Sequence, residues 1–177
     1  LTLIGVDFSL GFPRGTAEAL GLVGQPWRAM WELLGADVTD DERNLNNRFA
    51  VASGLNAKIG DDSAGPFWGC PPAQRTAHLT PTKPARSGAW PQEWRHVESR
   101  LRAEGLRPFS AWQLLGAGAV GSQSLVGIAA SWFTMSTNLN DLSLEKLLQL
   151  APVFTNEIES LISEAQCPIL KNTMDFY

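Results

Sequence analysis

The stretch Phe109-Ser-Ala-Trp-Gln-Leu-Leu115, followed by Gly116-Ala-Gly-Ala-Val-Gly-Ser-Gln123, decides the fold prediction. Residues 109–115 form a mostly apolar run of strand length, and the glycines after it mark a tight turn. A short helix is expected from there through Ile128. The segment therefore predicts a strand followed by a helix, as expected in a mixed α/β protein.

A second strand is expected at the start of the chain, in Leu1-Thr-Leu-Ile-Gly-Val-Asp-Phe8. A short apolar, β-branched run that ends in an acid is typical of a buried central strand. We therefore predict that residues 2–8 form an interior strand and that Asp7 faces a cleft at its C-terminal end.

Helices are expected wherever apolar residues recur at helical spacing. The first two are predicted at residues 16–20 and from Pro26 onward. A third follows the acids at 40–42, and a fourth runs from Pro91 to just before Gly105. Their expected inward residues are Trp27, Met30, Trp31 and Leu34, then Leu45, Phe49, Ala52 and Leu55, then Trp94, Val97 and Leu101.

A long segment without clear periodicity, residues 60–90, is rich in Gly, Pro, Ser and Thr. Such a loop is usually a lid, a binding loop or disordered. Trp68 and Trp90 lie in it and are candidates for stacking on a base or another planar ligand, with core packing as the alternative.

Charge divides the chain near Ile128. Up to that residue there are twelve acidic and twelve basic residues, whereas six acidic and two basic residues follow and carry the whole net charge of −4. All sixteen glycines and all ten arginines also precede Ala129. We predict an α/β domain over 1–128 and a helical C-terminal appendage over 129–177. Two amphipathic stripes in the appendage are expected to dock onto the domain: Leu144, Leu147, Leu148 and Ala151, then Ile158, Leu161, Ile162 and Ala165.

Composition narrows the classes of partner. A pI near 5.2 argues against a generally basic nucleic-acid surface, although a local basic groove stays possible. No apolar run is long enough to span a bilayer and no signal-peptide pattern opens the chain, which predicts a cytoplasmic protein without a membrane partner. Cys70 and Cys167 lack zinc-ligand spacing and are expected to be free thiols.

The glycines at 116, 118 and 121 match the G-x-G-x-x-G spacing of dinucleotide-binding loops. Only two helices, rather than further strands, are expected beyond the acid at Asp141, so NAD or FAD is not expected to bind. Two other interpretations are an anion site, in which Gly116, Gly118, Gly121 and Ser122 offer backbone and hydroxyl groups, and close backbone packing at a tight turn.

Two carboxylates are candidate metal ligands and catalytic residues. Asp7 ends the first predicted strand, with capping of the following turn as its alternative role. Glu98 lies on a polar helix stripe beside Arg95 and Arg102, where a solvated ion pair is the alternative. Asn46, Asn47 and Arg48 could present amides and a guanidinium to a phosphate or carboxylate, with ordinary helix-surface polarity as the alternative.

Four blocks occur in an order that resembles a known family: Gly5-Val-Asp-Phe-Ser-Leu-Gly-Phe-Pro13, Asn46-Asn-Arg-Phe49, Pro66-Phe-Trp-Gly69 and Trp112 through Gln123. The sequence is similar to an uncharacterised bacterial family whose members are often labelled as molybdopterin guanine dinucleotide synthesis or cobalamin-associated proteins. That family is related to predicted nucleases of the ribonuclease-H-like superfamily. The resemblance covers Leu3 to about Ile128, and the family's first Asp-bearing strand and its Trp-Pro-Phe-Glu block have no counterpart here.

The resemblance implies a partial ribonuclease-H-like sheet flanked by helices. The function it implies is metal-dependent phosphodiester hydrolysis on nucleic acid, with Mg²⁺ held by Asp7 and Glu98. Asn47 and Arg48 would orient the phosphate. Two alternatives remain: a non-catalytic module that binds a nucleotide or cofactor precursor through the glycine-rich loop, and a catalytically dead fragment with an interaction tail.

The hydrolase hypothesis predicts Mg²⁺- or Mn²⁺-dependent nuclease activity that is lost in Asp7→Asn. This substitution keeps the shape of the side chain and removes the charge that the metal needs. The measurement is cleavage of labelled nucleic acid by the wild type and the variant, with and without EDTA. Activity that survives EDTA or the substitution would place the chemistry elsewhere.

Overall fold

The computed structural model describes residues 6–43, 45–60 and 64–136, with the side chains described up to residue 132. The chain divides into two compact units, one made of Phe8–Thr137 and the other of Leu1–Asp7 with Asn138–Tyr177. The predicted strand at residues 2–8 and the predicted stripes of the 137–177 segment lie largely or wholly outside the described residues.

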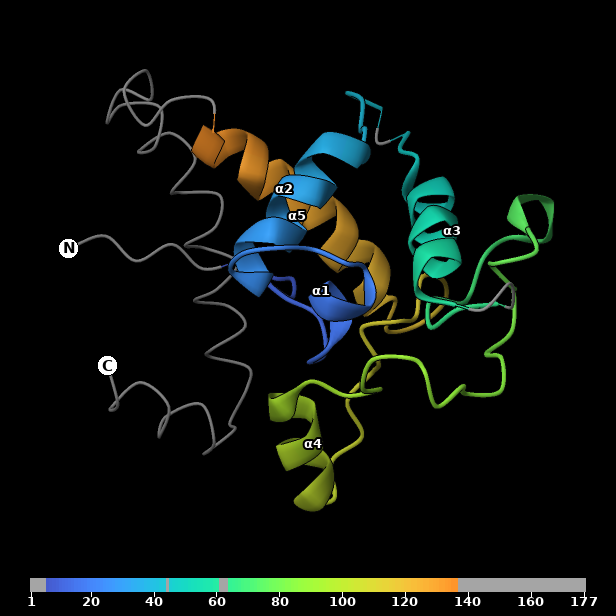
Figure 1. Ribbon diagram of the computed structural model, residues 1–177. Coiled ribbons are helices and arrows are strands. Elements are labelled where there is room, and N and C mark those ends of the chain that lie inside the picture. The colour runs from blue at the N-terminus through green and yellow to red at the C-terminus, as the bar shows by residue number, and fades with distance from the viewer. Residues whose placement is uncertain (1–5, 44, 61–63, 137–177) are drawn as a thin grey trace, which may run out of the picture. The chain divides into compact units, whose positions relative to one another are not determined.

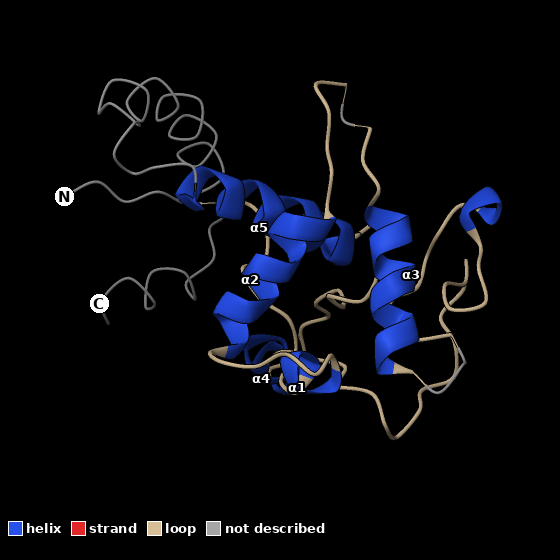
Figure 2. Ribbon diagram, turned by 45° about the horizontal axis from the view of Figure 1, so that its top comes forward, coloured by secondary structure: helices blue, strands red, loops and turns tan. Residues whose placement is uncertain are grey.

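The unit formed by residues 8–137 is helical (Figure 1). Its elements, in chain order, are α1 (Thr16–Ala19), α2 (Pro26–Asp37), α3 (Arg48–Ile59), a 3-10 turn η1 (Pro72–Gln74), α4 (His96–Ala103) and α5 (Val120–Ser136). Figure 2 shows the long loops that join them and no strand in the part of the chain that it colours.

The predicted α/β fold with a ribonuclease-H-like sheet is wrong. Among the described residues, the only β-type pairings are two isolated bridges, Asp40 with Asn46 and Trp68 with Gln113. The segment 109–115, expected as a strand, makes one such bridge: Trp68 N donates to Trp112 O at 3.0 Å, and Leu114 N donates to Trp68 O at 2.9 Å. Two further backbone groups of this segment bond to residues nearby in the sequence: Gln113 N donates to Ser110 O, and Gln113 O accepts from Gly121 N. An apolar run of this length fits a buried loop as well as a strand.

The core forms where α5 crosses α2, the most extensive helix pair of the fold. Leu125 and Ile128 of α5 and Leu34 of α2 are fully buried. Gly35 permits the close approach, because a Cβ there would lie 2.8 Å from Cγ of the Trp132 indole. Burying each large aliphatic side chain contributes about 1.5–3 kcal/mol, so this crossing stabilises the unit more than any other described pair of helices.

Asn56 of α3 ties the long loop to the helices. It is fully buried, and its Nδ2 donates to Phe67 O at 2.9 Å and to His78 O at 2.7 Å, while its Oδ1 accepts from Phe67 N at 3.0 Å. Gly65 passes so close that a Cβ would lie 2.5 Å from the Asn56 side chain. One amide therefore satisfies three backbone groups of a loop that has no sheet to pair with.

The helix predictions are confirmed in existence and partly wrong in detail. Helix α2 begins at Pro26, as predicted, whereas Thr16, which was expected to cap the first helix, is the first residue of α1, and Gly15 is its N-cap. Helix α3 begins at Arg48, several residues beyond the acids that were expected to start it. At the end of α4, Gly105 has φ 84° and Leu106 N donates to Leu101 O, which is the predicted glycine cap.

Helix α4 is oriented differently from its predicted stripe. Val97, expected to face inward, is 55% exposed, whereas Glu98 is 3% exposed. The buried ion pair of Glu98 decides which face of this short helix turns inward. Helix α5 is longer than expected and runs continuously through Ile128 and Ala129 to Ser136. None of the described helices is long and apolar enough to cross a membrane.

Replacing Asn56 by Ala should lower the free energy of unfolding by about 3 kcal/mol, because buried partners in the loop lose their hydrogen bonds. Denaturant unfolding of the full chain measures the change. Lys58→Ala, an exposed change on the same helix, serves as the control and should alter stability by less than about 0.5 kcal/mol. Equal stability of the two variants would show that the loop does not depend on Asn56.

Candidate functional site

The glycine-rich segment forms a tight turn that leads into α5. Gly116 and Gly118 have φ values of 93° and 73°, a region that only glycine enters without strain. Gln113 holds the turn closed, since its Nε2 donates to Leu115 O and Ala117 O, both at 3.0 Å. Helix α5 begins at Val120, directly after this turn, so its N-terminus lies beside the glycine-rich segment.

Gly121, in the first turn of α5, packs directly on the segment before the glycines. Its N donates to Gln113 O at 2.8 Å, and a Cβ at this position would lie 2.6 Å from Ala111 O. The third glycine of the motif therefore serves close backbone packing, which was one of the sequence interpretations. Gly118 leaves room for the ring of Phe109, because a Cβ at position 118 would collide with that ring.

Arg48, at the start of α3, reaches the first turn of α5. Its Nε donates to Ser122 Oγ at 3.1 Å, and its Nη1 donates to Asn46 Oδ1 at 2.6 Å. The Ser122 hydroxyl donates in turn to Leu114 O at 2.5 Å. The structure thus brings together Arg48 and Ser122, two candidates that are 74 residues apart in the sequence.

The guanidinium of Arg48 forms no ion pair with a described carboxylate. The four ion pairs among the described residues join Arg28 to Glu32, Lys83 to Glu93, Arg95 to Glu98 and Arg100 to Glu104, so Arg48 has no carboxylate partner there. The guanidinium is partly buried and lies at the positive end of the α5 dipole. A guanidinium at the positive end of a helix, with no carboxylate in ion-pair contact, favours binding of an anion.

Both polar atoms of the Asn47 side chain bond to backbone groups, so this residue has a structural role. Its Nδ2 donates to Asp37 O at 2.8 Å and its Oδ1 accepts from Thr39 N at 2.9 Å, which links the end of α2 to the start of α3. The neighbouring Asn46 is the residue that contacts Arg48. Because two adjacent asparagines have the same chemistry, the sequence contains no signal that distinguishes them.

Glu98 is engaged by Arg95 through both carboxylate oxygens. Oε1 accepts from Arg95 Nε at 3.0 Å and Nη2 at 2.5 Å, and Oε2 accepts from the Arg95 backbone N at 2.8 Å. Arg95 also donates to Ser9 Oγ, a residue that the sequence analysis did not select. A Mg²⁺ ion at Glu98 would have to compete with a buried, hydrogen-bonded ion pair.

Asp7 is exposed and belongs to the other compact unit. Within the described residues there is no group of three or more His, Cys, Asp or Glu side chains placed to hold a metal ion. Cys70 is a free thiol, as predicted, and burial raises the pKa of this thiol. Metal binding by Asp7 and Glu98 stays a prediction of the sequence.

A cavity of about 330 Å³ lies away from these residues. It is bounded by residues 10–18 and by the start of α2, where Trp27 and Trp31 contact each other edge to face. None of the residues that the sequence analysis selected for binding or catalysis lines it.

Comparison with known proteins found no matching family model, no similar curated protein and no similar solved structure.

The packing of α5 predicts that Gly121→Ala destabilises the fold by at least about 2 kcal/mol, because the added methyl group would overlap backbone oxygen atoms. Thermal and denaturant unfolding provide the measurement. Gly54→Ala is the matched control: it is a helical glycine with open space around its Cβ position, and the change should stabilise α3 by about 0.5–1 kcal/mol. If Gly121→Ala were as stable as Gly54→Ala, the close approach would not exist.

Proposed function

We propose that this chain is a binding module for a phosphate-type anion, such as the phosphate of a nucleotide or cofactor precursor, held between Arg48 and the first turn of α5. The observation that supports it is the contact of the Arg48 guanidinium with Ser122 Oγ, without a carboxylate partner among the described residues. A partly buried arginine that faces the positive end of a helix is repelled by the dipole unless an anion compensates.

The site between Arg48 and the first turn of α5 suits a phosphate better than a carboxylate, because a phosphate has more oxygen atoms that can accept hydrogen bonds. Nε and Nη1 of Arg48 are occupied by Ser122 and Asn46, which fix the plane of the guanidinium. Nη2 then remains to donate to a ligand. In the first turn of α5 the N–H groups of Val120, Gly121 and Gln123 donate to Gly118 O, Gln113 O and Ala119 O, so the backbone can add that of Ser122. The net charge of −4 repels anions in general, so any affinity has to come from this local geometry.

The hydrolase hypothesis and the anion-site proposal depend on different residues. It requires Asp7 and Glu98 to hold a metal ion, whereas the anion site needs neither residue. Binding without chemistry is therefore the function that the described residues support best, and hydrolysis stays a prediction from the sequence.

Arg48→Gln should weaken binding of inorganic phosphate and of nucleoside monophosphates by at least about tenfold, since a charge-assisted hydrogen bond contributes about 1.5–3 kcal/mol. Isothermal titration of the full chain at fixed ionic strength gives the affinities. Arg107→Gln removes the same charge from an exposed position and is the control.

The control should bind phosphate as the wild type does, apart from a small electrostatic change that disappears at high salt. Ser122→Ala should weaken binding less than Arg48→Gln, because it loosens the guanidinium without removing its charge. Equal affinities of Arg48→Gln and Arg107→Gln would refute the proposed site.

A further inference from the structure

The apolar stripe of α2 ends in an exposed tryptophan. Trp27, Met30 and Leu34 recur at helical spacing and so share one face of this helix. Leu34 is fully buried and Met30 is 5% exposed, whereas Trp27, predicted to face inward, is 53% exposed. The face is therefore covered by the core over most of its length and open at the N-terminal end of α2, the helix that α1 contacts (Figure 1).

A cavity of about 330 Å³ lies at this open end. Small-molecule sites in proteins start at about 300 Å³, so the space suits a ligand of one or two rings. All of its lining belongs to one compact unit and none of it to the proposed anion site. The lining consists of the 10–18 segment, Pro26, Trp27, Met30 and Trp31 of α2, and Ile128 of α5.

The lining is held in place by contacts with the rest of the unit. The ring of Phe12 packs on those of Phe67 and Trp112, at centroid distances of 5.7 and 5.9 Å. Met30 and Ile128 are part of the same buried core. The cavity is therefore preformed, which keeps the conformational cost of binding low.

Two perpendicular indoles border the cavity. The ring centroids of Trp27 and Trp31 lie 6.1 Å apart and the ring planes are at 88°. Aromatic rings attract one another face to face with an offset or edge to face, beyond what their buried area provides. A third ring can make such a contact with whichever part of each indole borders the cavity, so the pair favours an aromatic ligand over an aliphatic one of equal size.

The N–H groups of both indoles already have acceptors. Trp31 Nε1 donates to Leu10 O at 3.0 Å, and Trp27 Nε1 donates to Gln25 Oε1 at 3.1 Å. These rings are therefore oriented by the protein itself, and they offer a ligand apolar surface rather than a hydrogen-bond donor.

The remaining polar side chains of the lining favour a ligand without net charge. The hydroxyl of Thr16 donates to Pro13 O at 2.6 Å, so this donor is also used. Arg14 and Glu18 are the charged residues of the lining, both are exposed, and their charges offset each other. A ligand with a net charge would lose hydration without gaining an unopposed counter-charge.

We propose that this cavity binds a small, uncharged aromatic molecule of one or two fused rings, held against Trp27 and Trp31. The site shares no residue with the anion site at Arg48, so the two proposals stand or fall separately.

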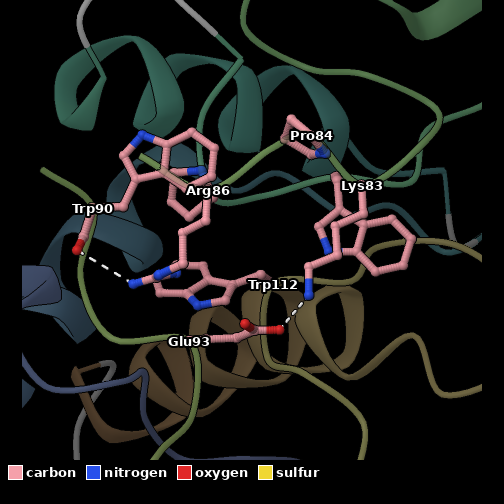
Figure 3. Close-up of a pocket in the computed structure, with 8 residues that line it drawn as sticks. Lys83, Pro84, Arg86, Trp90, Glu93 and Trp112 are labelled. Carbon is pink, nitrogen blue, oxygen red and sulfur yellow. Dashed lines mark hydrogen bonds and ion pairs between the residues drawn. The ribbon is translucent and has the colours of Figure 1, made fainter. Parts of the chain in front are cut away.

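A second space, lined by residues of the 83–93 loop, supplies an internal control. Figure 3 shows Trp90 and Trp112 there, with Arg86 and the Lys83–Glu93 ion pair. Its volume of about 10 Å³ is close to that of a single water molecule, so it is too small for a ring. The indoles of Trp90 and Trp112 should therefore not respond to an aromatic ligand.

The test uses 2-naphthol, an uncharged two-ring probe, and nuclear magnetic resonance of the indole N–H groups in the ¹⁵N-labelled full chain. Single Trp→Phe substitutions assign the signals. Those of Trp27 and Trp31 should shift saturably, because a bound aromatic ring changes the magnetic field at neighbouring protons, and those of Trp90 and Trp112 should not move. Decahydro-2-naphthol, the saturated analogue, should bind about fivefold more weakly.

Trp27→Ala should raise the dissociation constant of 2-naphthol about tenfold, whereas Trp27→Phe keeps an aromatic ring and should change it by less than about threefold. Because Trp27 is exposed, neither variant should unfold the chain, and the other indole signals check this. Trp94→Ala is the matched control, since it removes an indole that lies outside the cavity and under the guanidinium of Arg102.

Equal affinity of the wild type and Trp27→Ala for 2-naphthol would overturn the proposal. Equal affinity for the saturated analogue, or similar shifts of all the indole signals, would overturn it as well. 2-Naphthoate adds a negative charge to the same rings and should bind no more tightly at Trp27 and Trp31. Tighter binding of 2-naphthoate there would overturn the assignment to an uncharged ligand.

Discussion

The contact of the first turn of α5 with the 111–114 segment is the constraint on which the rest of the structure depends. Gly121 allows the helix to approach Ala111 O and Gln113 O at a distance that no side chain would permit. From that anchor, Leu125 and Ile128 reach the core against α2, and Ser122 is placed beside Arg48. A shift of this contact would therefore disturb the core and the proposed anion site together.

Side-chain hydrogen bonds take the place of a sheet in this unit. Long loops carry many backbone N–H and C=O groups into the interior, and each needs a partner. Asn56 supplies three of these hydrogen bonds, and Glu98 accepts from the backbone N–H of Arg95 at the start of α4. The same demand makes the two unpaired indoles of Trp68 and Trp90 conspicuous, since nearly every other buried polar side chain described has a partner.

The proposed anion site depends on a donor whose orientation is fixed by its neighbours. At Arg48 a charged guanidinium is oriented by Ser122 and Asn46 and faces the end of a helix, so it suits a polyatomic anion. This site lies where a loop meets a helix, and it depends on segments that are far apart in the sequence.

The sequence alone determined the local features: the start of α2, the glycine cap after α4, and the tight turn at Gly116–Gly121 that leads into α5. These follow from the conformational limits of glycine and proline and from helical spacing, which act within a few residues. Only the tertiary structure decided that residues 109–115 pair once with Trp68 instead of joining a sheet, that Glu98 rather than Val97 turns inward, and that Asn46 rather than Asn47 meets Arg48. Each of these outcomes depends on a partner distant in the chain, and neither apolar periodicity nor residue type specifies which partner a buried backbone or charged group will find.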